Sequence, residues 1–223
     1  MRELNKSILH LELPERMRYL PIDDRGYPVP KFVPKINGKW EFRGFDPEHM
    51  VICVRHKKCW LCGNPLGKHL TFPIGPMCMI NRCISEPPSH LTCAEYGVRA
   101  CPFLANPAMR RNEKNMPAHE VAGISIRRNP GVIALWTTLS YRIIKPPNGG
   151  VLFEIGDPEH VEFYCEGRRA TREEILHSIE TGLPFLRKEA AQDGPGALQE
   201  LDRRLEAAMK VLATYTYEIG SGV

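Results

Sequence analysis

The chain has 223 residues, of which 43% are hydrophobic and 25% charged, and 30 Lys and Arg against 26 Asp and Glu give a formal net charge of +4. A chain of this length can bury a hydrophobic core without the help of disulfides or metal ions. The composition is ordinary for a globular protein. No apolar run approaches the roughly 18 residues of a membrane helix, and residues 1–6 lack the apolar stretch of a signal peptide. We therefore expect a cytoplasmic protein of one or two domains without membrane contact.

The N-terminal region is rich in turn signals. The first 30 residues contain four prolines and no periodicity, so we expect an irregular segment that runs over other elements. Strand-like runs at 31–36 and 39–43 then flank Asn37 and Gly38. Asn-Gly suits a type I′ turn, in which both central residues have positive φ, so this stretch predicts a hairpin.

Two Asp-Pro pairs have the form of a helix start, because Asp caps free N–H groups and Pro suits the first turn. Asp46 and Pro47 predict a short helix over 47–57. Asp157 and Pro158 carry the same signal later in the chain. We expect a helix to begin at each pair.

Seven of the eight cysteines lie between residues 53 and 101. The cysteines are Cys53, Cys59, Cys62, Cys78, Cys83, Cys93, Cys101 and Cys165. Without a secretory signal, such clustering indicates a metal site or buried thiols and argues against a disulfide framework.

Two pairs of residues have the spacing of zinc ligands. Cys59 and Cys62 form a knuckle, in which Gly63 permits the positive φ that closes the turn. His90 and Cys93 follow after a gap of 27 residues; with Ser89 as a helix N-cap they would share one face of the first turn. Four protein ligands leave no open position, so we expect a structural Zn²⁺ in a treble-clef-like module, similar also to the first half of a LIM module.

Other cysteines offer alternative ligand sets. Cys78 and Cys83 could replace His90, combine with the knuckle pair to hold an iron–sulfur cluster, or form a second site with Cys101. Cys101 lies eight residues after Cys93, about 12 Å along a continuous helix. That distance is too long for one ion, so we expect Cys101 to be a buried thiol.

Basic residues flank the cysteine pairs. Arg55, Lys57 and Lys58 precede the knuckle, and Arg82 lies between the two pairs. Guanidinium and ammonium groups bind phosphates, so these four residues are candidate nucleic-acid contacts. The overall pI of about 8.6 is below the value typical of nucleic-acid-binding domains.

The middle of the chain predicts strands after a connection. Residues 105–119 lack periodicity, and we expect an exposed connection there. Residues 131–138 are β-branched and almost continuously apolar, which is typical of a buried strand. A turn over 146–150 leads to a second strand over 151–155.

The C-terminal part predicts helices. Thr171 and Glu174 form a capping box, and we expect Gly182 and Pro184 to end that helix. A second, amphipathic helix is predicted over 196–215, with its apolar stripe facing the core. That stripe consists of Leu198, Leu201, Leu205, Ala208, Met209 and Leu212.

Several strings along most of the chain resemble a family of small, uncharacterised proteins encoded by bacteriophages and prophages, with a treble-clef-like CxxC…HxxC zinc module. The strings are residues 25–30, 59–63, 75–78, 86–90, 93–96, 101–104 and 167–171. The resemblance implies no activity. It implies a setting in the host cytoplasm, with nucleic acid or a host protein as the partner.

The sequence thus predicts an α+β protein with a small sheet, a treble-clef-like zinc module and C-terminal helices. We divide it into an N-terminal hairpin and short helix (1–58), the zinc module (59–104) and an α+β region (105–223), which can form one compact domain with the rest.

The expected function is binding to nucleic acid, or regulation of a process that involves it, by a zinc-stabilised protein. One alternative is an HNH-like metal-dependent nuclease, with His69 activating water and Asn81 holding the ion. Another is an adaptor or inhibitor that binds a host protein through the zinc module or the C-terminal helices. No common enzyme motif is present, and the sequence leaves open whether the protein is an enzyme.

Overall fold

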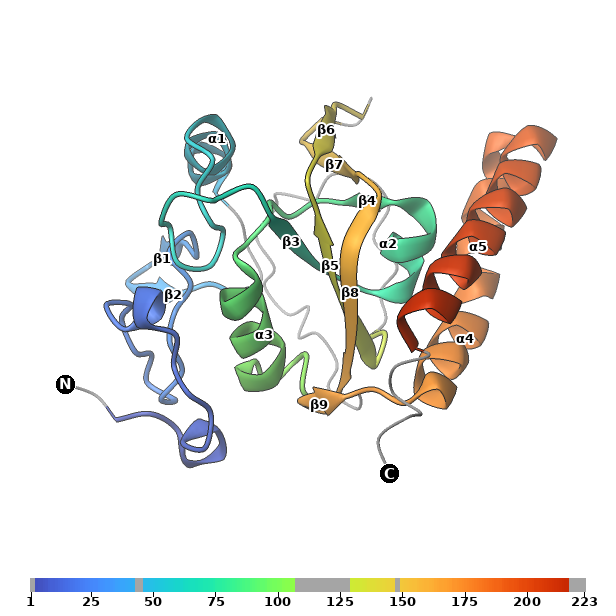
Figure 1. Cartoon of the computed structure of the whole chain (residues 1–223). Helices are drawn as coiled ribbons and strands as arrows, with labels where there is room; N and C mark the ends of the chain where they lie inside the picture. The colour runs from blue at the N-terminus through green and yellow to red at the C-terminus, as the bar shows by residue number, and fades with distance from the viewer. Residues whose placement is uncertain (1–2, 43–45, 107–128, 147–148, 217–223) are drawn as a thin grey trace.

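The computed structural model describes most of the chain. The described residues are 3–42, 46–106, 129–146 and 149–216. They form a mixed α+β fold with antiparallel sheets, which confirms the predicted α+β class. The largest sheet stands at the centre, with α3 (Leu91–Ala100) on one side and α4 (Arg172–Ala190) and α5 (Pro195–Thr216) on the other (Figure 1). No helix in these ranges has both the length and the apolarity to span a bilayer.

The central sheet has the strand order β3, β5, β8, β9. Its strands are β3 (Leu70–Ile74), β5 (Val132–Thr138), β8 (Pro158–Cys165) and β9 (Arg168–Arg169). Every residue of β5 is buried, because both faces of the sheet are covered. Val132, Ala134 and Trp136 pack in the core with α4 and α5, whereas Ile133 and Leu135 pack with α3. This two-sided burial explains the continuous apolar run in the sequence.

A second sheet has the order β4, β7, β6. Its strands are β4 (Cys83–Ile84), β7 (Leu152–Ile155) and β6 (Tyr141–Ile144). Aromatic rings join it to the central sheet: the ring centroids of Phe72 and Tyr141 are 5.8 Å apart, and those of Tyr141 and Phe153 are 5.4 Å apart. β7 confirms the strand predicted over 151–155. β4 and β6 were not predicted, and β4, with two residues, is too short for periodicity to predict.

The two Asp-Pro pairs have different structures. Asp46 caps α1 (Pro47–Arg55) by accepting a 2.8 Å hydrogen bond from a backbone N–H, as predicted. The prediction of a helix at Asp157 and Pro158 is wrong, because Pro158 begins β8. The side chain of Asp157 accepts a hydrogen bond from Arg82, and β8 pairs with β5. Tertiary strand pairing therefore overrides the local helix signal.

Helix α4 begins as predicted but ends later. The capping box of Thr171 and Glu174 is present, with both of its hydrogen bonds. The predicted end at Gly182 and Pro184 is wrong, since α4 continues beyond the proline. Gly182 and Leu186 are both buried, so apolar packing on either side of Pro184 holds the chain helical.

Helix α5 confirms the amphipathic helix predicted over 196–215. Leu201, Ala208 and Leu212 are buried in the main core, and α5 packs against α2 (Pro76–Asn81), α4 and β8. Its apolar stripe therefore serves the core, as expected. Helix α2 itself lies in a stretch for which no helix was predicted.

The N-terminal segment forms a separate small core around the cysteine pairs. The hairpin of β1 (Lys35–Ile36) and β2 (Lys39–Trp40) is confirmed, and positive φ angles of 49° at Asn37 and 76° at Gly38 match the expected turn. The irregular segment ahead of it buries four apolar side chains against Cys59, Cys62, Cys93 and Tyr96. These side chains are Ile8, Leu11, Met17 and Leu20.

The central sheet links two of the predicted units. It takes β3 from residues 59–104 and β5, β8 and β9 from residues 105–223, so the two stretches share one sheet. The exposed connection predicted over 105–119 lies almost wholly outside the described residues.

Candidate metal centre

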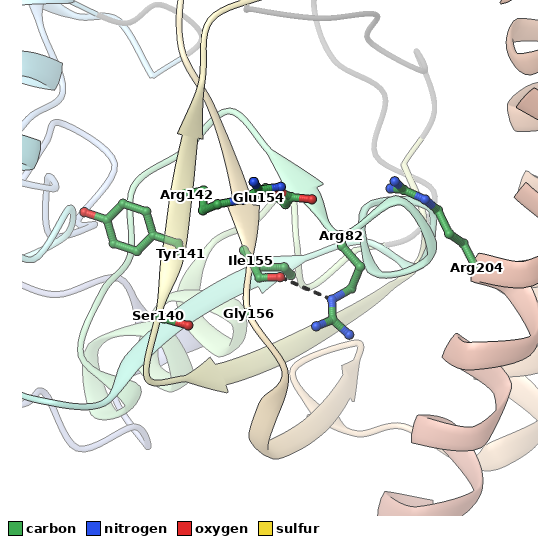
Figure 2. Close-up of a pocket in the computed structure, with 8 residues that line it drawn as sticks. All are labelled: Arg82, Ser140, Tyr141, Arg142, Glu154, Ile155, Gly156 and Arg204. Atoms are coloured by element: carbon green, nitrogen blue, oxygen red, sulfur yellow. Dashed lines mark hydrogen bonds and ion pairs between the residues drawn. The ribbon is translucent and has the colours of Figure 1, made fainter. Parts of the chain in front are cut away.

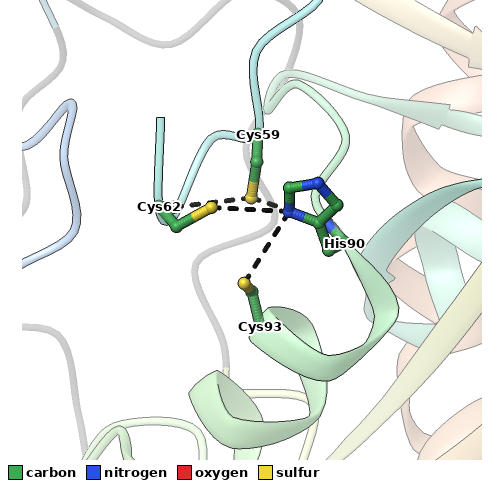
Figure 3. A group of neighbouring side chains, drawn as sticks. All are labelled: Cys59, Cys62, His90 and Cys93. Atoms are coloured by element: carbon green, nitrogen blue, oxygen red, sulfur yellow. Dashed lines mark hydrogen bonds between the residues drawn. The ribbon is translucent and has the colours of Figure 1, made fainter. Parts of the chain in front are cut away.

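Four side chains converge between the central sheet and the N-terminal segment (Figure 3). The ligand atoms of Cys59, Cys62, His90 and Cys93 all lie within 4.8 Å of one another. All three cysteines are 0% exposed. Among the described residues this is the one group of three or more His, Cys, Asp or Glu side chains with convergent ligand atoms. The structure therefore brings together the four residues predicted as metal ligands.

The first two ligands lie on a tight knuckle. The N–H of Cys59 donates to the carbonyl of Asn64 and the N–H of Gly63 donates to the carbonyl of Cys59, both at 2.8 Å. The N–H of Cys62 points at the sulfur of Cys59, 3.4 Å away. Gly63 has φ +71°, and a Cβ there would lie 2.6 Å from Cγ of Lys31. Both the turn and its close packing thus require glycine.

The other two ligands begin helix α3. His90 is the N-cap, one residue later than the predicted Ser89, and Cys93 lies in the first turn. Ser89 instead forms two backbone hydrogen bonds with Thr71 of β3, 2.9 and 2.8 Å long. The N–H of His90 donates to the sulfur of Cys59 at 3.4 Å. The bridge to β3 fixes the start of the helix opposite the knuckle.

The geometry of His90 suits a metal ligand. Its Nε2 lies 3.0 Å from the carbonyl oxygen of Pro65. A carbonyl only accepts, so Nε2 carries the proton and Nδ1 keeps its lone pair. Nδ1 lies 3.4 Å from the sulfur of Cys62 and 3.8 Å from that of Cys93. A tetrahedral zinc ion with Zn–S of about 2.3 Å and Zn–N of about 2.0 Å separates sulfur from nitrogen by about 3.5 Å, which these distances match.

The electrostatics of the thiols also favour a cation. Hydrogen bonds from Cys62 and Cys93 lower the pKa of Cys59. The same hydrogen bonds raise the pKa of Cys62 and Cys93, and burial raises them further. One thiolate therefore forms readily, while the second and third are opposed by the charge already present. A divalent cation at the centre removes this conflict, and the donor set of three sulfurs and one imidazole is consistent with zinc.

The N-terminal segment covers the knuckle. The hydroxyl of Tyr19 donates to the carbonyl of Cys62, and the N–H of Lys31 donates to the carbonyl of Leu61 at 2.7 Å. On the other side, the N–H of Trp60 donates to the carbonyl of Pro88 at 3.1 Å. The protein itself thus supplies four ligands and a closed shell, which is the arrangement of a structural site.

The remaining cysteines lie outside the centre. Cys78 on α2 and Cys83 on β4 are not in the convergent group, and α2 packs against α4 and α5. The structure therefore contradicts an iron–sulfur cluster shared between these two and the knuckle. Burial raises the pKa of Cys78 to about 11 and that of Cys53 to about 12, and it also raises the pKa of Cys101. Cys53 is buried, whereas Cys78 and Cys101 are only partly buried, and the raised pKa keeps all three thiols protonated at neutral pH. The expected buried thiol at Cys101 is therefore found only in part.

Three of the four predicted nucleic-acid contacts lie together. Arg55 ends α1, Lys57 and Lys58 lead into the knuckle, and Arg55 and Lys57 are exposed. Arg82 does not join them. Its guanidinium lies over the ring of Trp136 at 4.5 Å and pairs with Asp157 at 2.9 Å.

Neither residue proposed for a nuclease belongs to the metal centre. His69 is exposed just ahead of β3. Asn81 ends α2, and its carbonyl accepts a hydrogen bond from Arg204 of α5. The carbonyl of Pro65 was missed from the sequence, because a backbone acceptor leaves no signal in residue identity.

Comparisons with known proteins give no relatives. No protein-family model matches the chain, and neither the curated proteins nor the solved structures contain a significant match.

Proposed function

We propose that this protein is a zinc-stabilised nucleic-acid-binding protein of bacteriophage type, active in the host cytoplasm. Zinc would hold Cys59, Cys62, His90 and Cys93 and thereby shape the surface beside the knuckle. The contact surface is formed by Arg55, Lys57 and Lys58, named here the knuckle cationic surface.

The distribution of ion pairs is the observation that carries the proposal. Within the described ranges, Arg55, Lys57 and Lys58 form no ion pair with a carboxylate. Several arginines of the C-terminal half, in contrast, have acidic partners: Arg168 pairs with Glu174, and Arg187 pairs with Asp202, both at 2.6 Å. Cations without an internal partner can neutralise phosphates without first giving up an ion pair.

The net charge is also distributed unevenly along the chain, with a surplus of basic residues in the N-terminal part. Residues 1–69 contain 13 Lys and Arg against 8 Asp and Glu, which exceeds the surplus of the whole chain. This stretch holds the knuckle cationic surface and the first two metal ligands. A zinc module in a basic region favours a polyanion as partner.

The likeness to a treble clef supports the same class of function. A knuckle and the first turn of a helix supply the ligands, and the Thr71–Ser89 bridge lies between them. In this chain β3 pairs mainly with β5, and β4 pairs with β7. Treble clefs bind nucleic acids and proteins alike. The cations without ion pairs are our reason to propose nucleic acid as the partner.

The test is binding of labelled DNA and RNA, single- and double-stranded, measured by fluorescence anisotropy over a series of salt concentrations. The variant Arg55→Glu/Lys57→Glu should lose at least about tenfold in affinity, with a smaller salt dependence, because two phosphate contacts are lost. A matched control reverses two exposed cations on α4, Arg172→Glu/Lys188→Glu, and should bind like the wild type.

Two results would oppose the proposal. Absence of binding to all four nucleic acids at low salt would reject it and leave an adaptor or inhibitor of a host protein. Equal loss in both double variants would show that only net charge matters and that the knuckle cationic surface is no specific contact.

A further inference from the structure

A pocket of about 390 Å³ opens between the second sheet, the end of α2 and helix α5 (Figure 2). Three arginines from three different elements line it: Arg82 follows α2, Arg142 lies on β6 and Arg204 lies on α5. The metal centre and the knuckle cationic surface contribute no residue to this pocket.

Arg82 is held rigidly at the wall of the pocket. It has φ 57° and ψ 31°, the left-handed conformation that residues other than glycine rarely adopt. Its carbonyl accepts from the N–H of Ile155 at 2.9 Å, and its Nε donates back to the carbonyl of Ile155 at 3.3 Å. The guanidinium also lies over the ring of Trp136, with Cζ 4.5 Å from the ring centroid. Contacts within the fold therefore hold both the backbone and the side chain of Arg82 in place.

The other two guanidiniums are also oriented by partners. Nε of Arg204 donates to Glu200 at 2.9 Å and its Nη1 to the carbonyl of Asn81 at 2.6 Å. Arg142 is paired with Glu154, to which its Nε donates at 2.7 Å. In each arginine these bonds fix the plane of the guanidinium while leaving nitrogen for a further acceptor.

Each of these three arginines has one terminal guanidinium nitrogen without a hydrogen bond to the described residues. In the described part of the chain, no hydrogen bond involves Nη1 of Arg82, Nη1 of Arg142 or Nη2 of Arg204. The three arginines line one pocket together with Glu154, so the pocket offers guanidinium nitrogens to an oxyanion with several acceptor atoms.

The floor of the pocket is shaped by a close approach of two backbone segments. A Cβ on Gly156 would lie 2.7 Å from the carbonyl oxygen of Ser140, so only glycine fits there. The carboxylate of Asp157 pairs with Arg82 from outside, and its side chain is 100% exposed. Such a solvated pair is weak and exchanges readily with a competing anion.

We propose that this pocket binds the phosphate group of a small phosphorylated solute through Arg82, Arg142 and Arg204, with Asp157 displaced from Arg82. The site is separate from the proposed nucleic-acid surface and gives the protein a second, small-molecule ligand.

The test is isothermal titration of the zinc-loaded protein with inorganic phosphate and with pyrophosphate at low ionic strength. Arg142→Gln and Arg204→Gln should each weaken binding about tenfold, the effect of one charge-assisted hydrogen bond. Asp157→Asn removes the competing carboxylate and should tighten binding severalfold. Arg187→Gln breaks an ion pair of similar length outside the pocket and should bind like the wild type.

Absence of a binding heat up to about 10 mM ligand, a range that covers the weakest specific affinities, would overturn the inference. Unchanged affinity in both Arg142→Gln and Arg204→Gln would also overturn it. A third contrary outcome is loss of phosphate binding in Arg55→Glu/Lys57→Glu. The last would place the phosphate on the knuckle cationic surface. Zinc content and circular dichroism of each variant establish that it is folded, so failure of this site is distinguishable from failure of the proposed function.

Discussion

The ring of His90 and the carbonyl of Pro65 lie 3.0 Å apart, and this contact turns Nδ1 toward the three thiols. Pro65 belongs to the loop that closes the knuckle, in which Lys58 and Pro65 form a β-bridge. The knuckle therefore supplies two ligands directly and orients a third. An outer partner of this kind fixes both the tautomer and the direction of a metal-binding imidazole.

Loss of one ligand should release the metal and unfold the small core around it. We expect the wild type to bind one zinc per chain. His90→Ala and Cys62→Ser should lose it and lower Tm by about 10 °C or more, because binding energy at a structural site is folding energy. Metal analysis by mass spectrometry and thermal unfolding measure this. Cys101→Ser, which alters a thiol outside the centre, should keep the zinc. Full zinc content in His90→Ala would exclude His90 as a ligand.

The glycine of the knuckle should be irreplaceable. Gly63→Ala places a Cβ 2.6 Å from Lys31 at φ +71°, so we expect a loss of about 1–3 kcal/mol in unfolding free energy, together with weaker zinc retention against a chelator. Gly67→Ala is the matched control, since nothing lies within 4 Å of its Cβ position. Similar stability of the two variants would argue against the tight turn.

The charge of Glu174 should stabilise the fold in a defined pH range. Hydrogen bonds from Arg168 hold the pKa of Glu174 at about 2, below the value of about 4.3 in an unfolded chain. The stabilisation is therefore complete above about pH 4.5 and is lost as the pH falls toward 2. Glu174→Gln keeps a capping side chain and removes only the charge.

We expect Glu174→Gln to be less stable than the wild type by about 0.5–1 kcal/mol at pH 7, a value discounted because Arg168 is half exposed. The difference should shrink at pH 3 and vanish near pH 2. Urea unfolding at several pH values measures it, and a difference independent of pH would refute the assignment to charge.

The proline inside α4 should weaken the helix. Pro184 is exposed within a continuous helix, where it removes one backbone hydrogen bond. Pro184→Ala should therefore raise the unfolding free energy by about 1–3 kcal/mol. Ala190→Pro is a useful contrast, because it places a proline at the last residue of the same helix. A destabilised Pro184→Ala would mean that the proline has a packing role.

The sequence predicts those features that depend on neighbouring residues. Asn37 and Gly38 form their turn, Asp46 caps its helix, and Thr171 with Glu174 begins α4. Each of these rests on hydrogen bonds or φ preferences within a few residues. Local chemistry is sufficient there, because no distant segment competes for the same backbone groups.

Features that depend on distant partners could not be predicted. Asp157 is followed by proline, just as Asp46 is. Its side chain nevertheless binds Arg82, and the residues after it pair with β5. Pro184 remains helical because Gly182 and Leu186, two residues before and after it, are buried. In both places the free energy of packing exceeds a local preference of about 1–3 kcal/mol.

The metal centre shows the same division within one site. The spacing of Cys59 and Cys62, and of His90 and Cys93, determined which residues could bind one ion. Only the tertiary structure decided that Cys78 and Cys83 stay apart and that His90 presents Nδ1. The choice of ligands follows from short-range geometry along the chain, whereas the convergence of the two pairs depends on the bridge between β3 and the start of α3, a contact that residue identity does not encode.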